Sequence, residues 1–163
     1  MHVLLRSAVP ADLPGIVAIY NHAISTSVAT FDLEPFSVAE RSAWFASFDA
    51  ARPLFVAERA GSVVGFAYYS DFREKAGYAR TKEVTVYVAP SAQGAGVGRS
   101  LLDAVIEHAR GAGVHVLMAA LGGDNPASLA LHTRAGFVAA GTWREVGRKF
   151  DAWVDVTLLQ KIL

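Results

Sequence analysis

The segment from Gln93 to Arg99 has a residue spacing that could bind a phosphate group. It reads Gln-Gly-Ala-Gly-Val-Gly-Arg, so a glycine stands at every second position from Gly94 to Gly98. An apolar, β-branched stretch precedes the segment, and a helical stripe of Leu, Val and Ile follows it. Glycine lets the backbone approach a ligand closely, and the free N–H groups and positive dipole of a helix start attract anions. The segment therefore predicts a pyrophosphate site, although a flexible turn would use the same glycines.

Several other kinds of chemistry lack their residues in this chain. The Gly-Lys-Ser/Thr of a P-loop and the Gly-x-Gly-x-x-Gly of a dinucleotide fold are both absent. There is no cysteine, which removes disulfides, thiolate metal sites and cysteine nucleophiles, and there is no Gly-x-Ser-x-Gly hydrolase elbow. The five histidines, at positions 2, 22, 108, 115 and 132, are not spaced as metal ligands, so we expect no metal. Because 15 Lys and Arg balance 15 Asp and Glu, we expect no nucleic-acid partner.

The length and composition predict one folded domain that spans residues 1–163. Of the 163 residues, 53% are hydrophobic and 18% are charged, which is typical of a chain that buries a core. The N-terminus lacks the basic flank and apolar run of a signal peptide, and no run approaches the roughly 18 apolar residues of a membrane span. We therefore expect a cytoplasmic protein that does not bind a membrane.

Apolar periodicity predicts the elements that would position the glycine-rich segment. A first helix is predicted to begin at 10–14, ahead of a loop at 25–32, and a second at a Ser-x-x-Glu capping box over 37–40. A third helix follows the glycines and ends at 111–113, and a fourth runs over 125–135, before Gly136. The order predicts an α/β (α+β) domain with a mixed sheet and helices on both of its faces. Alternating or β-branched runs predict the strands, over residues 3–6, 54–58, 63–70, 81–88, 114–121, 137–145 and 152–161.

Two segments in this order resemble the coenzyme A motifs of the GNAT N-acetyltransferase family. Gln93-Gly94-Ala95-Gly96-Val97-Gly98 is similar to that family's Gln/Arg-x-x-Gly-x-Gly/Ala signature, between a strand and a helix. Asn125-Pro126-Ala127-Ser128-Leu129-Ala130-Leu131-His132 is similar to its second segment, which ends in Gly-Phe, here Gly136-Phe137. The resemblance covers essentially the whole chain. It implies the GNAT fold, with a mixed, mostly antiparallel central sheet, and acetyl-CoA as the co-substrate.

Three further segments, at residues 18–23, 29–32 and 146–153, resemble the phosphinothricin acetyltransferase branch of that family. The branch acetylates the α-amino group of amino acids or of analogues such as phosphinothricin and methionine sulfone. The resemblance therefore implies a small amino-acid-like acceptor. The branch's Thr-Val-Glu-His/Asn-Ser-Val-Tyr-Val reads Thr-Lys-Glu-Val-Thr-Val-Tyr-Val over residues 81–88. The glutamate, Glu83, is kept, whereas Lys82, Val84 and Thr85 depart from the pattern and leave the identity of the acceptor open.

Glu83 is the candidate general base. The amine of an amino acid is mostly protonated at pH 7, so acetyl transfer needs a group that removes a proton. Glu83 lies in an apolar strand, where burial could raise its pKa toward a useful range, although charged strand residues more often face solvent. Lys82 would point to the opposite face of the strand, as a surface charge. For the departing thiolate, His132 is the candidate general acid, and a neutral structural histidine is the alternative.

Acetyl-CoA would be held mainly by backbone groups. An extended strand can pair with the amide-bearing pantetheine arm, and the N–H of Val86 could bond the thioester oxygen. Asn125 would either contact the coenzyme or only cap its helix, and Ser128 lies one turn further along the same face. The resemblance implies these cofactor-binding residues: Val86, Tyr87, Val88, Gln93, Gly94, Ala95, Gly96, Val97, Gly98, Arg99, Asn125 and Ser128.

The carboxylate of the acceptor would need cations and hydrogen-bond donors. Arg73, Tyr78 and Arg80 lie in the connection that enters the Glu83 strand, so they are candidates for substrate binding. Phe31 is a candidate apolar wall. The alternatives are solvated loop side chains and, for Phe31, a place in the core.

The sequence therefore predicts an acetyl-CoA-dependent N-acetyltransferase that acts by direct transfer on the α-amino group of a small amino acid. Two alternatives are the same fold acting on a protein or peptide N-terminus and a catalytically silent acetyl-CoA-binding module. The resemblance also implies a homodimer. The aromatic Trp143, Phe150 and Trp153 would belong to its interface or to the core.

Overall fold

The computed structural model describes residues 3–163 as strands, α-helices and three short 3-10 helices. The α-helices are α1 (Leu13–Thr26), α2 (Val38–Phe45), α3 (Val97–Gly111) and α4 (Pro126–Arg134), and the 3-10 helices are η1 (Pro10–Asp12), η2 (Ala76–Tyr78) and η3 (Pro90–Ala92). Within this range, no helix is both long enough and apolar enough to cross a membrane. The strands are β1 (Leu4–Ser7), β2 (Leu54–Arg59), β3 (Ser62–Asp71), β4 (Thr81–Val88), β5 (Val116–Gly122), β6 (Val138–Lys149) and β7 (Ala152–Ile162).

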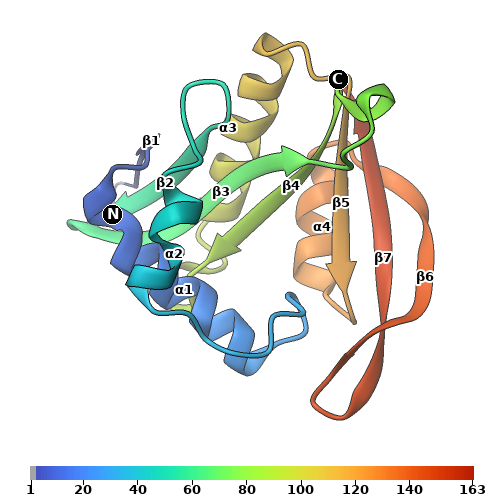
Figure 1. Ribbon diagram of the computed structural model, residues 1–163, viewed down its shortest axis with the longest axis horizontal. Coiled ribbons are helices and arrows are strands. Elements are labelled where there is room, and N and C mark those ends of the chain that lie inside the picture. The colour runs from blue at the N-terminus through green and yellow to red at the C-terminus, as the bar shows by residue number, and fades with distance from the viewer. Residues whose placement is uncertain (1–2) are drawn as a thin grey trace.

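The strands of residues 3–163 form one seven-stranded sheet in the order β1-β2-β3-β4-β5-β7-β6 (Figure 1). β4 and β5 are parallel neighbours, and every other neighbouring pair is antiparallel. A parallel pair needs a crossover, which α3 supplies between β4 and β5. The prediction of a mixed, mostly antiparallel sheet is confirmed.

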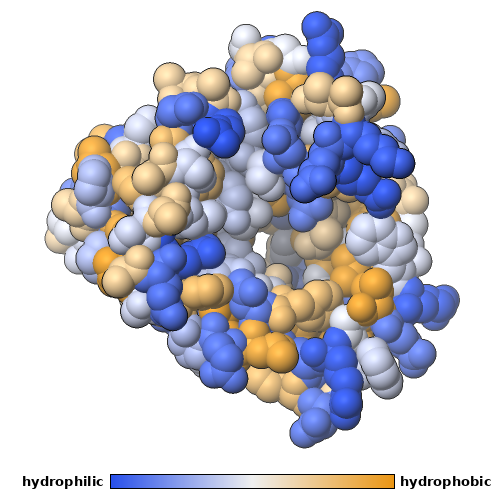
Figure 2. All heavy atoms as spheres, viewed as in Figure 1, coloured by the Kyte–Doolittle hydropathy of each residue, from blue (hydrophilic) through white to orange (hydrophobic). Residues whose placement is uncertain are grey.

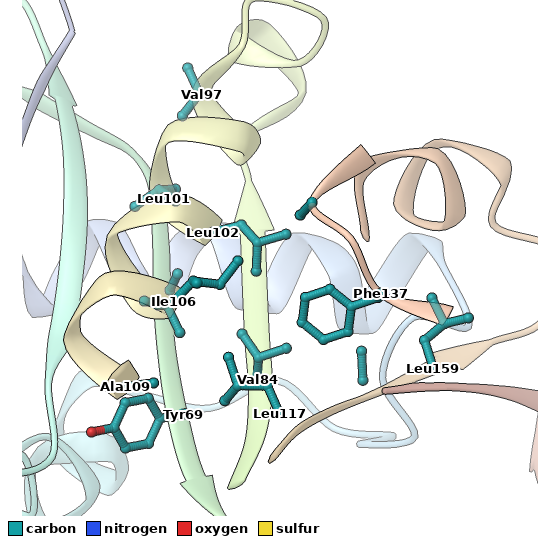
Figure 3. Close-up of a cluster of buried hydrophobic side chains, with 14 of the residues drawn as sticks. Tyr69, Val84, Val97, Leu101, Leu102, Ile106, Ala109, Leu117, Phe137 and Leu159 are labelled. Atoms are coloured by element: carbon teal, nitrogen blue, oxygen red, sulfur yellow. The ribbon is translucent and has the colours of Figure 1, made fainter. Parts of the chain in front are cut away.

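Helices cover both faces of the sheet and bury an apolar cluster under each. α1 and α2 pack on one face, where Ile16 and Phe66 are almost fully buried. α3 and α4 pack on the other face, where Leu101, Leu102 and Leu117 of the larger cluster are fully buried (Figure 3). Each fully buried side chain of this kind stabilises the fold by about 1.5–3 kcal/mol, so the apolar stripe of α3 holds that helix firmly on the sheet. The expected helices on both faces are confirmed.

Local sequence signals explain where two of the helices begin. The Ser37 hydroxyl accepts from the Glu40 N–H at 3.2 Å, and the Glu40 carboxylate accepts from the Ser37 N–H at 2.7 Å, which is the predicted capping box of α2. The side-chain oxygen of Asn125 accepts from the Ser128 N–H at 3.0 Å and caps α4. After α4, Gly136 has a φ of +87°, the left-handed conformation predicted there.

Strand β6 is longer than the sequence predicts. It continues to Lys149 instead of ending at residue 145. The pairing register with β7 shifts between Trp143 and Gly147, and Glu145 has a φ of +50°. This bulge interrupts the alternation of inward and outward side chains, so a period-two pattern detects only the first half of the strand. The helix α1 is also slightly longer, because it reaches Thr26, inside the predicted loop.

Candidate active site

Strands β4 and β5 separate from one another partway along their length. Their last paired residues are Glu83 and Met118, although β4 continues to Val88 and β5 to Gly122. Figure 1 shows the two strands diverging, and Figure 2 shows an opening through the molecule at that place. Beyond Glu83, the edge of β4 toward β5 therefore has no strand paired to it. Glu83 itself lies at the point of divergence.

The backbone groups at this open edge belong to the even-numbered residues of β4. In an antiparallel ladder, alternate residues direct their N–H and C=O groups to opposite sides of the strand. The Ala89 N–H donates to the Val64 carbonyl at 2.9 Å, so the odd-numbered residues of β4 face β3. Val86 and Val88 consequently direct their backbone groups to the opening. The Val88 carbonyl accepts from the Gln93 side chain, which leaves the Val88 N–H and both groups of Val86 for a strand-like ligand. The backbone of Tyr87, predicted as a further coenzyme contact, is directed to β3 instead.

The glycine-rich turn leads from this edge into the start of α3. Gly94 and Gly96 have φ values of +73° and +80°, and a Cβ atom on either would meet no atom within 4 Å. Their conformation, and not crowding, is what requires glycine there. α3 begins at Val97 with no side-chain cap and no acidic residue in its first turn. Free N–H groups and an uncompensated helix dipole therefore lie where β4 ends, which fits an anionic group such as a pyrophosphate.

Two polar side chains of the predicted phosphate site are engaged within the protein. The side-chain amide of Gln93 donates to the Val88 carbonyl at 3.2 Å. The Arg99 guanidinium donates to the Asp103 carboxylate at 2.7 Å and to the Arg134 carbonyl at 2.9 Å, which ties α3 to the end of α4. In this arrangement the turn offers a ligand mainly its backbone, including that of Ala95, Val97 and Gly98.

His132 belongs to α4 and is buried, with only 4% of its surface exposed. Its Nδ1 lies 2.8 Å from the Ser128 carbonyl oxygen, and because a carbonyl can only accept, Nδ1 must carry the hydrogen. Burial lowers the pKa of His132, and the bond to the Ser128 carbonyl opposes that effect. The ring also packs edge to face on Phe137, with centroids 5.1 Å apart. A neutral ring whose Nε2 has no hydrogen cannot protonate a thiolate, so the geometry favours the structural interpretation over the predicted acid role.

The Glu83 side chain lies on the face of the sheet that α1 and α2 cover, because Val84, next to it on β4, belongs to the cluster under α3. Burial raises the pKa of Glu83, as a base for an ammonium requires. Tyr68 of β3 is paired with Thr85 of β4, and burial raises the pKa of Tyr68. The charge of Arg41 lowers that tyrosine's pKa, and the charges of Glu83 and Asp32 raise it. The charges of Glu83, Arg41 and Asp32 therefore all influence the pKa of the Tyr68 hydroxyl.

The loop over residues 27–37, between α1 and α2, covers this region and is held by polar contacts. The Tyr20 hydroxyl lies 2.9 Å from the Thr30 hydroxyl and donates to the Asp32 carboxylate. Burial, together with that bond to Asp32, raises the pKa of Tyr20 to about 12, so its hydroxyl stays protonated as a donor. The Tyr87 hydroxyl donates to a loop carbonyl at residue 29, at 3.2 Å, and the Lys149 ammonium donates to the Thr30 carbonyl at 2.8 Å. The loop is thus fastened to α1, to β4 and to the end of β6.

The predicted acceptor-binding residues do not all gather near Glu83. The Arg73 guanidinium lies over the rings of Phe72 and Tyr78, at 5.1 and 5.8 Å, as one exposed group in the connection before β4. Phe31 lies in the loop over residues 27–37, against Gly147 of β6. Arg80 lines a separate cavity of about 890 Å³ beside the end of α3, together with Lys82. That cavity opens on the α3 face of the sheet, so the structure does not bring the Arg80 side chain together with Glu83.

Four residues near the site were missed by the sequence interpretation. Tyr68 belongs to a strand pattern that fits the core equally well, and Arg41 sits in an ordinary helical turn. Asp32 and Lys149 fall inside segments that resemble the phosphinothricin branch, and that was a usable signal. Lys82 lines the cavity on the α3 face, so its side chain points away from that of Glu83, as predicted. Lys82 also forms an ion pair with Asp71.

Within residues 3–163, no three side chains of His, Asp and Glu are arranged to hold a metal ion. His2, one of the five histidines, lies outside the described residues.

A strand that diverges from its parallel neighbour, followed by a glycine turn and an uncapped helix, is the architecture of an acetyltransferase. Residues 16–137 match the model of the acetyltransferase (GNAT) family. The chain belongs to the GNAT family, and it is an N-acetyltransferase by that membership.

Three relatives are similar over nearly the whole chain. The L-methionine sulfoximine/L-methionine sulfone acetyltransferase of Pseudomonas paraeruginosa is 44% identical over 162 residues, which cover 98% of this chain and 94% of the relative. A crystal structure of a ribosomal-protein-alanine N-acetyltransferase from Brucella melitensis is 43% identical, with a TM-score of 0.95 and coverage of 98% of this chain and 99% of that one. The phosphinothricin acetyltransferase of Sinorhizobium meliloti, solved in complex with acetyl-CoA, is 35% identical, with a TM-score of 0.95 and coverage of 100% and 89%.

Proposed function

We propose that this chain transfers the acetyl group of acetyl-CoA to the α-amino group of a small amino acid or amino-acid analogue. The observation that carries the proposal is the position of Glu83, a desolvated carboxyl group where β4 leaves β5 and an unpaired backbone edge begins. The names of the Pseudomonas and Sinorhizobium relatives support an acceptor of the methionine sulfone or phosphinothricin kind.

The proposed coenzyme site follows β4 backwards from the start of α3. The pyrophosphate would bind the backbone of the glycine turn and the first turn of α3. The pantetheine arm would pair with the backbone of Val86 and Val88, with Asn125 and Ser128 beside it on α4. Because this path runs from the end of β4 toward its middle, it would bring the thioester close to Glu83.

In the proposed reaction, Glu83 takes a proton from the acceptor ammonium, directly or through one water. The free amine attacks the thioester carbonyl, and the Val86 N–H stabilises the negative charge that develops on its oxygen. A C–N bond forms and the C–S bond breaks, so coenzyme A leaves as a thiolate. The thiolate takes up, through solvent, the second proton that the attacking nitrogen loses, and Glu83 releases the first proton to solvent. The product is the N-acetyl amino acid, with no acyl-enzyme.

The experiment that tests the proposal is thiol release from acetyl-CoA, read with a thiol-reactive dye. The chain has no cysteine, so the protein contributes no thiol background. The acceptors are methionine sulfone, phosphinothricin, the common amino acids and a short peptide. We expect turnover with a free amino acid and loss of that turnover in Glu83→Gln. Turnover with the peptide alone would overturn the proposal.

A second candidate function is acetylation of a protein N-terminus. It is favoured by the Brucella relative, whose name gives ribosomal-protein alanine as its acceptor. The fastened loop over residues 27–37 argues for a small enclosed acceptor instead, and the peptide in the panel distinguishes the two. Tight acetyl-CoA binding without turnover on any acceptor would favour the silent acetyl-CoA-binding module.

We further propose a homodimer that acts in the cytoplasm. The aromatic residues considered above for an interface are exposed, with 43% of Trp143, 59% of Phe150 and 63% of Trp153 accessible. Trp143 lies on β6, Trp153 on β7 and Phe150 in the turn between them, and β6 is the outermost strand of the sheet on that side. Sedimentation velocity tests the dimer, and a dimer that dissociates on Trp153→Glu would support this surface. The cytoplasm, where acetyl-CoA is made and used, and the absence of a nucleic-acid partner stay predictions.

A further inference from the structure

The loop over residues 27–37 crosses the opening between β4 and β5. The Ala29 carbonyl accepts a hydrogen bond from the Tyr87 hydroxyl of β4 at 3.2 Å, and Val28 lies against Gly122 at the end of β5. Tyr87 and Gly122 belong to the parts of the two strands that have already diverged. Figure 1 shows the loop reaching from the end of α1 toward the end of β5. The loop therefore bridges the two strands a second time, on the face of the sheet that α1 and α2 cover.

The contact of the loop with β5 requires glycine. A Cβ atom on Gly122 would lie 2.2 Å from the Val28 carbonyl oxygen, and one on Gly123 would lie 2.5 Å from a Val28 side-chain carbon. The backbone of Val28 thus lies directly on the backbone of β5, with no side chain between them. Because a backbone carbonyl cannot swing aside as the end of a long side chain can, this contact fixes the first part of the loop.

Asn21 of α1 holds the other end of the loop. Its side-chain amide donates to the Phe36 carbonyl at 2.7 Å, and its side-chain oxygen accepts from the Phe36 N–H at 2.9 Å. The carboxamide thus pairs with both backbone groups of one residue, as a neighbouring strand would. A side chain that could only donate, or only accept, would satisfy just one of these two groups. Asn21 therefore fixes the last part of the loop on α1.

Phe31 lies between these two anchors, and 38% of it is exposed. Its ring packs toward Gly147 of β6 and lies 3.8 Å from the Cβ position of Gly122, beside the opening. Aromatic side chains commonly line the pockets that bind small ligands. A loop that is fastened at both ends keeps this ring in one place, so the ring can serve as a fixed wall for the apolar part of a ligand.

We propose that Asn21 is a positioning residue that holds the loop as a rigid bridge over the opening, and that this bridge limits the length of the acceptor side chain. The loop joins β4 and β5 at Ala29 and Val28, so the strands cannot separate further to admit a longer side chain. A loop released at Phe36 would instead let the Phe31 wall yield. This inference rests on the proposed function, because it concerns the acceptor of that reaction.

The test compares two acceptors that differ by one methylene group, methionine sulfone and ethionine sulfone. An extra methylene against a fixed apolar wall changes kcat/KM by about 10- to 200-fold, so the wild type should prefer methionine sulfone at least about 10-fold. Asn21→Leu is similar in volume but forms neither bond, and its preference should fall below about 3-fold, through KM and not through kcat. Asn21→Asp accepts from the Phe36 N–H but cannot donate to the carbonyl, so its preference should be intermediate.

His22→Leu, at the exposed neighbouring position of α1, is the matched control and should keep the wild-type preference. The Kd for acetyl-CoA should be the same in the wild type and in all three variants. An equal loss of kcat/KM for both sulfones in Asn21→Leu would indicate a purely structural role and overturn the inference, as would a wild type that uses both sulfones equally well. If Asn21→Leu does not fold, Asn21→Asp decides. If another amino acid is the acceptor, that compound and its homologue with one more methylene replace the sulfones.

Hydrogen exchange of the Phe36 amide separates this inference from the proposed reaction, because it needs no acceptor. We expect this amide to be protected in the wild type and in His22→Leu, and to exchange at least about 10-fold faster in Asn21→Leu. Rapid exchange in the wild type would show that the loop is not held, and would overturn the inference whatever the activity. Protection that is lost in Asn21→Leu, without turnover of any acceptor, would support the rigid bridge and count against the proposed function alone.

Discussion

The ammonium of Lys149 donates a 2.8 Å hydrogen bond to the carbonyl oxygen of Thr30, 119 positions away in the sequence. Only 4% of Lys149 is exposed. Burial lowers the pKa of its ammonium, and the charge of Asp32 opposes that effect. The contact joins the end of β6 to the loop that covers the Glu83 region, so the β6–β7 hairpin helps to set the shape of the proposed acceptor site.

Removal of this contact should loosen the loop while sparing the coenzyme site. Lys149→Met leaves the Thr30 carbonyl without its donor, and we expect the free energy of unfolding to fall by about 1–3 kcal/mol. The KM for the amino acid should rise, and the affinity for acetyl-CoA should stay the same. Urea unfolding and initial rates measure both effects, with the exposed Lys75→Met as the control. A higher acetyl-CoA Kd in Lys149→Met would contradict the expectation that this contact affects the acceptor site alone.

The pH dependence of activity should report the titration of Glu83. Burial raises its pKa, and only the deprotonated carboxylate can take a proton, so kcat/KM should fall as the pH drops below that raised pKa. Glu83→Gln should lower kcat/KM by about 10²- to 10⁴-fold and should abolish this acidic limb. The exposed Glu74→Gln is the matched control. An acidic limb that persists unchanged in Glu83→Gln would assign the base to another group.

A methyl group should be tolerated poorly at Gly96, in the glycine turn, and well at Gly77, in η2. Gly96 has a φ of +80°, whereas Gly77 has no left-handed φ, and neither has an atom within 4 Å of its Cβ position. Gly96→Ala should cost about 1–2 kcal/mol of backbone strain and weaken acetyl-CoA binding about 10-fold by shifting the turn. Gly77→Ala should leave the Kd unchanged. Equal Kd values for the two variants, measured by calorimetry, would argue against a phosphate group at this turn.

Phe31 depends on a glycine that faces it. A Cβ atom on Gly147 would lie 2.3 Å from the Phe31 ring, so Gly147→Ala must displace the ring or the strand. We expect a loss of about 1–3 kcal/mol in unfolding free energy and a higher KM for the acceptor. In a double-mutant cycle, Phe31→Leu should recover part of the stability lost in Gly147→Ala. Strictly additive losses would show that the two residues do not compete for that space.

His132 should affect stability more than chemistry. Its folded-state pKa is lowered, so below about pH 6.5 the unfolded chain binds more protons than the folded one, and stability falls as the pH decreases from there. His132→Gln should reduce that pH dependence, whereas the exposed His115→Gln should not. The variant's kcat should fall less than about 10-fold, because a general acid would contribute about 10²- to 10⁴-fold. A loss of that larger size in a stably folded His132→Gln would restore the acid role.

The sequence was sufficient for the elements whose signals are local. The capping box at Ser37, the cap at Asn125 and the left-handed Gly136 each depend on a few neighbouring residues, and all three are present. β6 was predicted too short because the bulge at Glu145 breaks the alternation on which strand prediction relies. The backbone edge at Val86 and Val88 was predicted through a resemblance. The reason that it is open, the divergence of β4 from β5, is a tertiary property.

The acceptor side of the site was harder to predict than the coenzyme side. Coenzyme binding uses consecutive backbone groups, which a motif can describe. The Glu83 region instead combines side chains from α1, α2, β3, β4 and β6. Arg80 and Glu83 are close in sequence, yet Arg80 lines the cavity on the α3 face and Glu83 lies on the opposite face, whereas α2, which is distant in sequence, packs its Trp44 ring on Tyr68 of β3. Sequence distance therefore does not decide which cationic side chains lie near Glu83.

Because β4 and β5 diverge, the stability of the folded protein should depend on the concentration of coenzyme A. The amides of Val86 and Val88 point away from β3, so they should exchange with deuterium in the free protein and become protected when coenzyme A is bound. The amides of Thr85 and Tyr87, which face β3, should be protected in both states. A ligand that binds only the folded chain at 100 times its Kd adds about 2.7 kcal/mol to stability. In a cell, the lifetime of this protein against proteolysis would then rise and fall with the coenzyme pool.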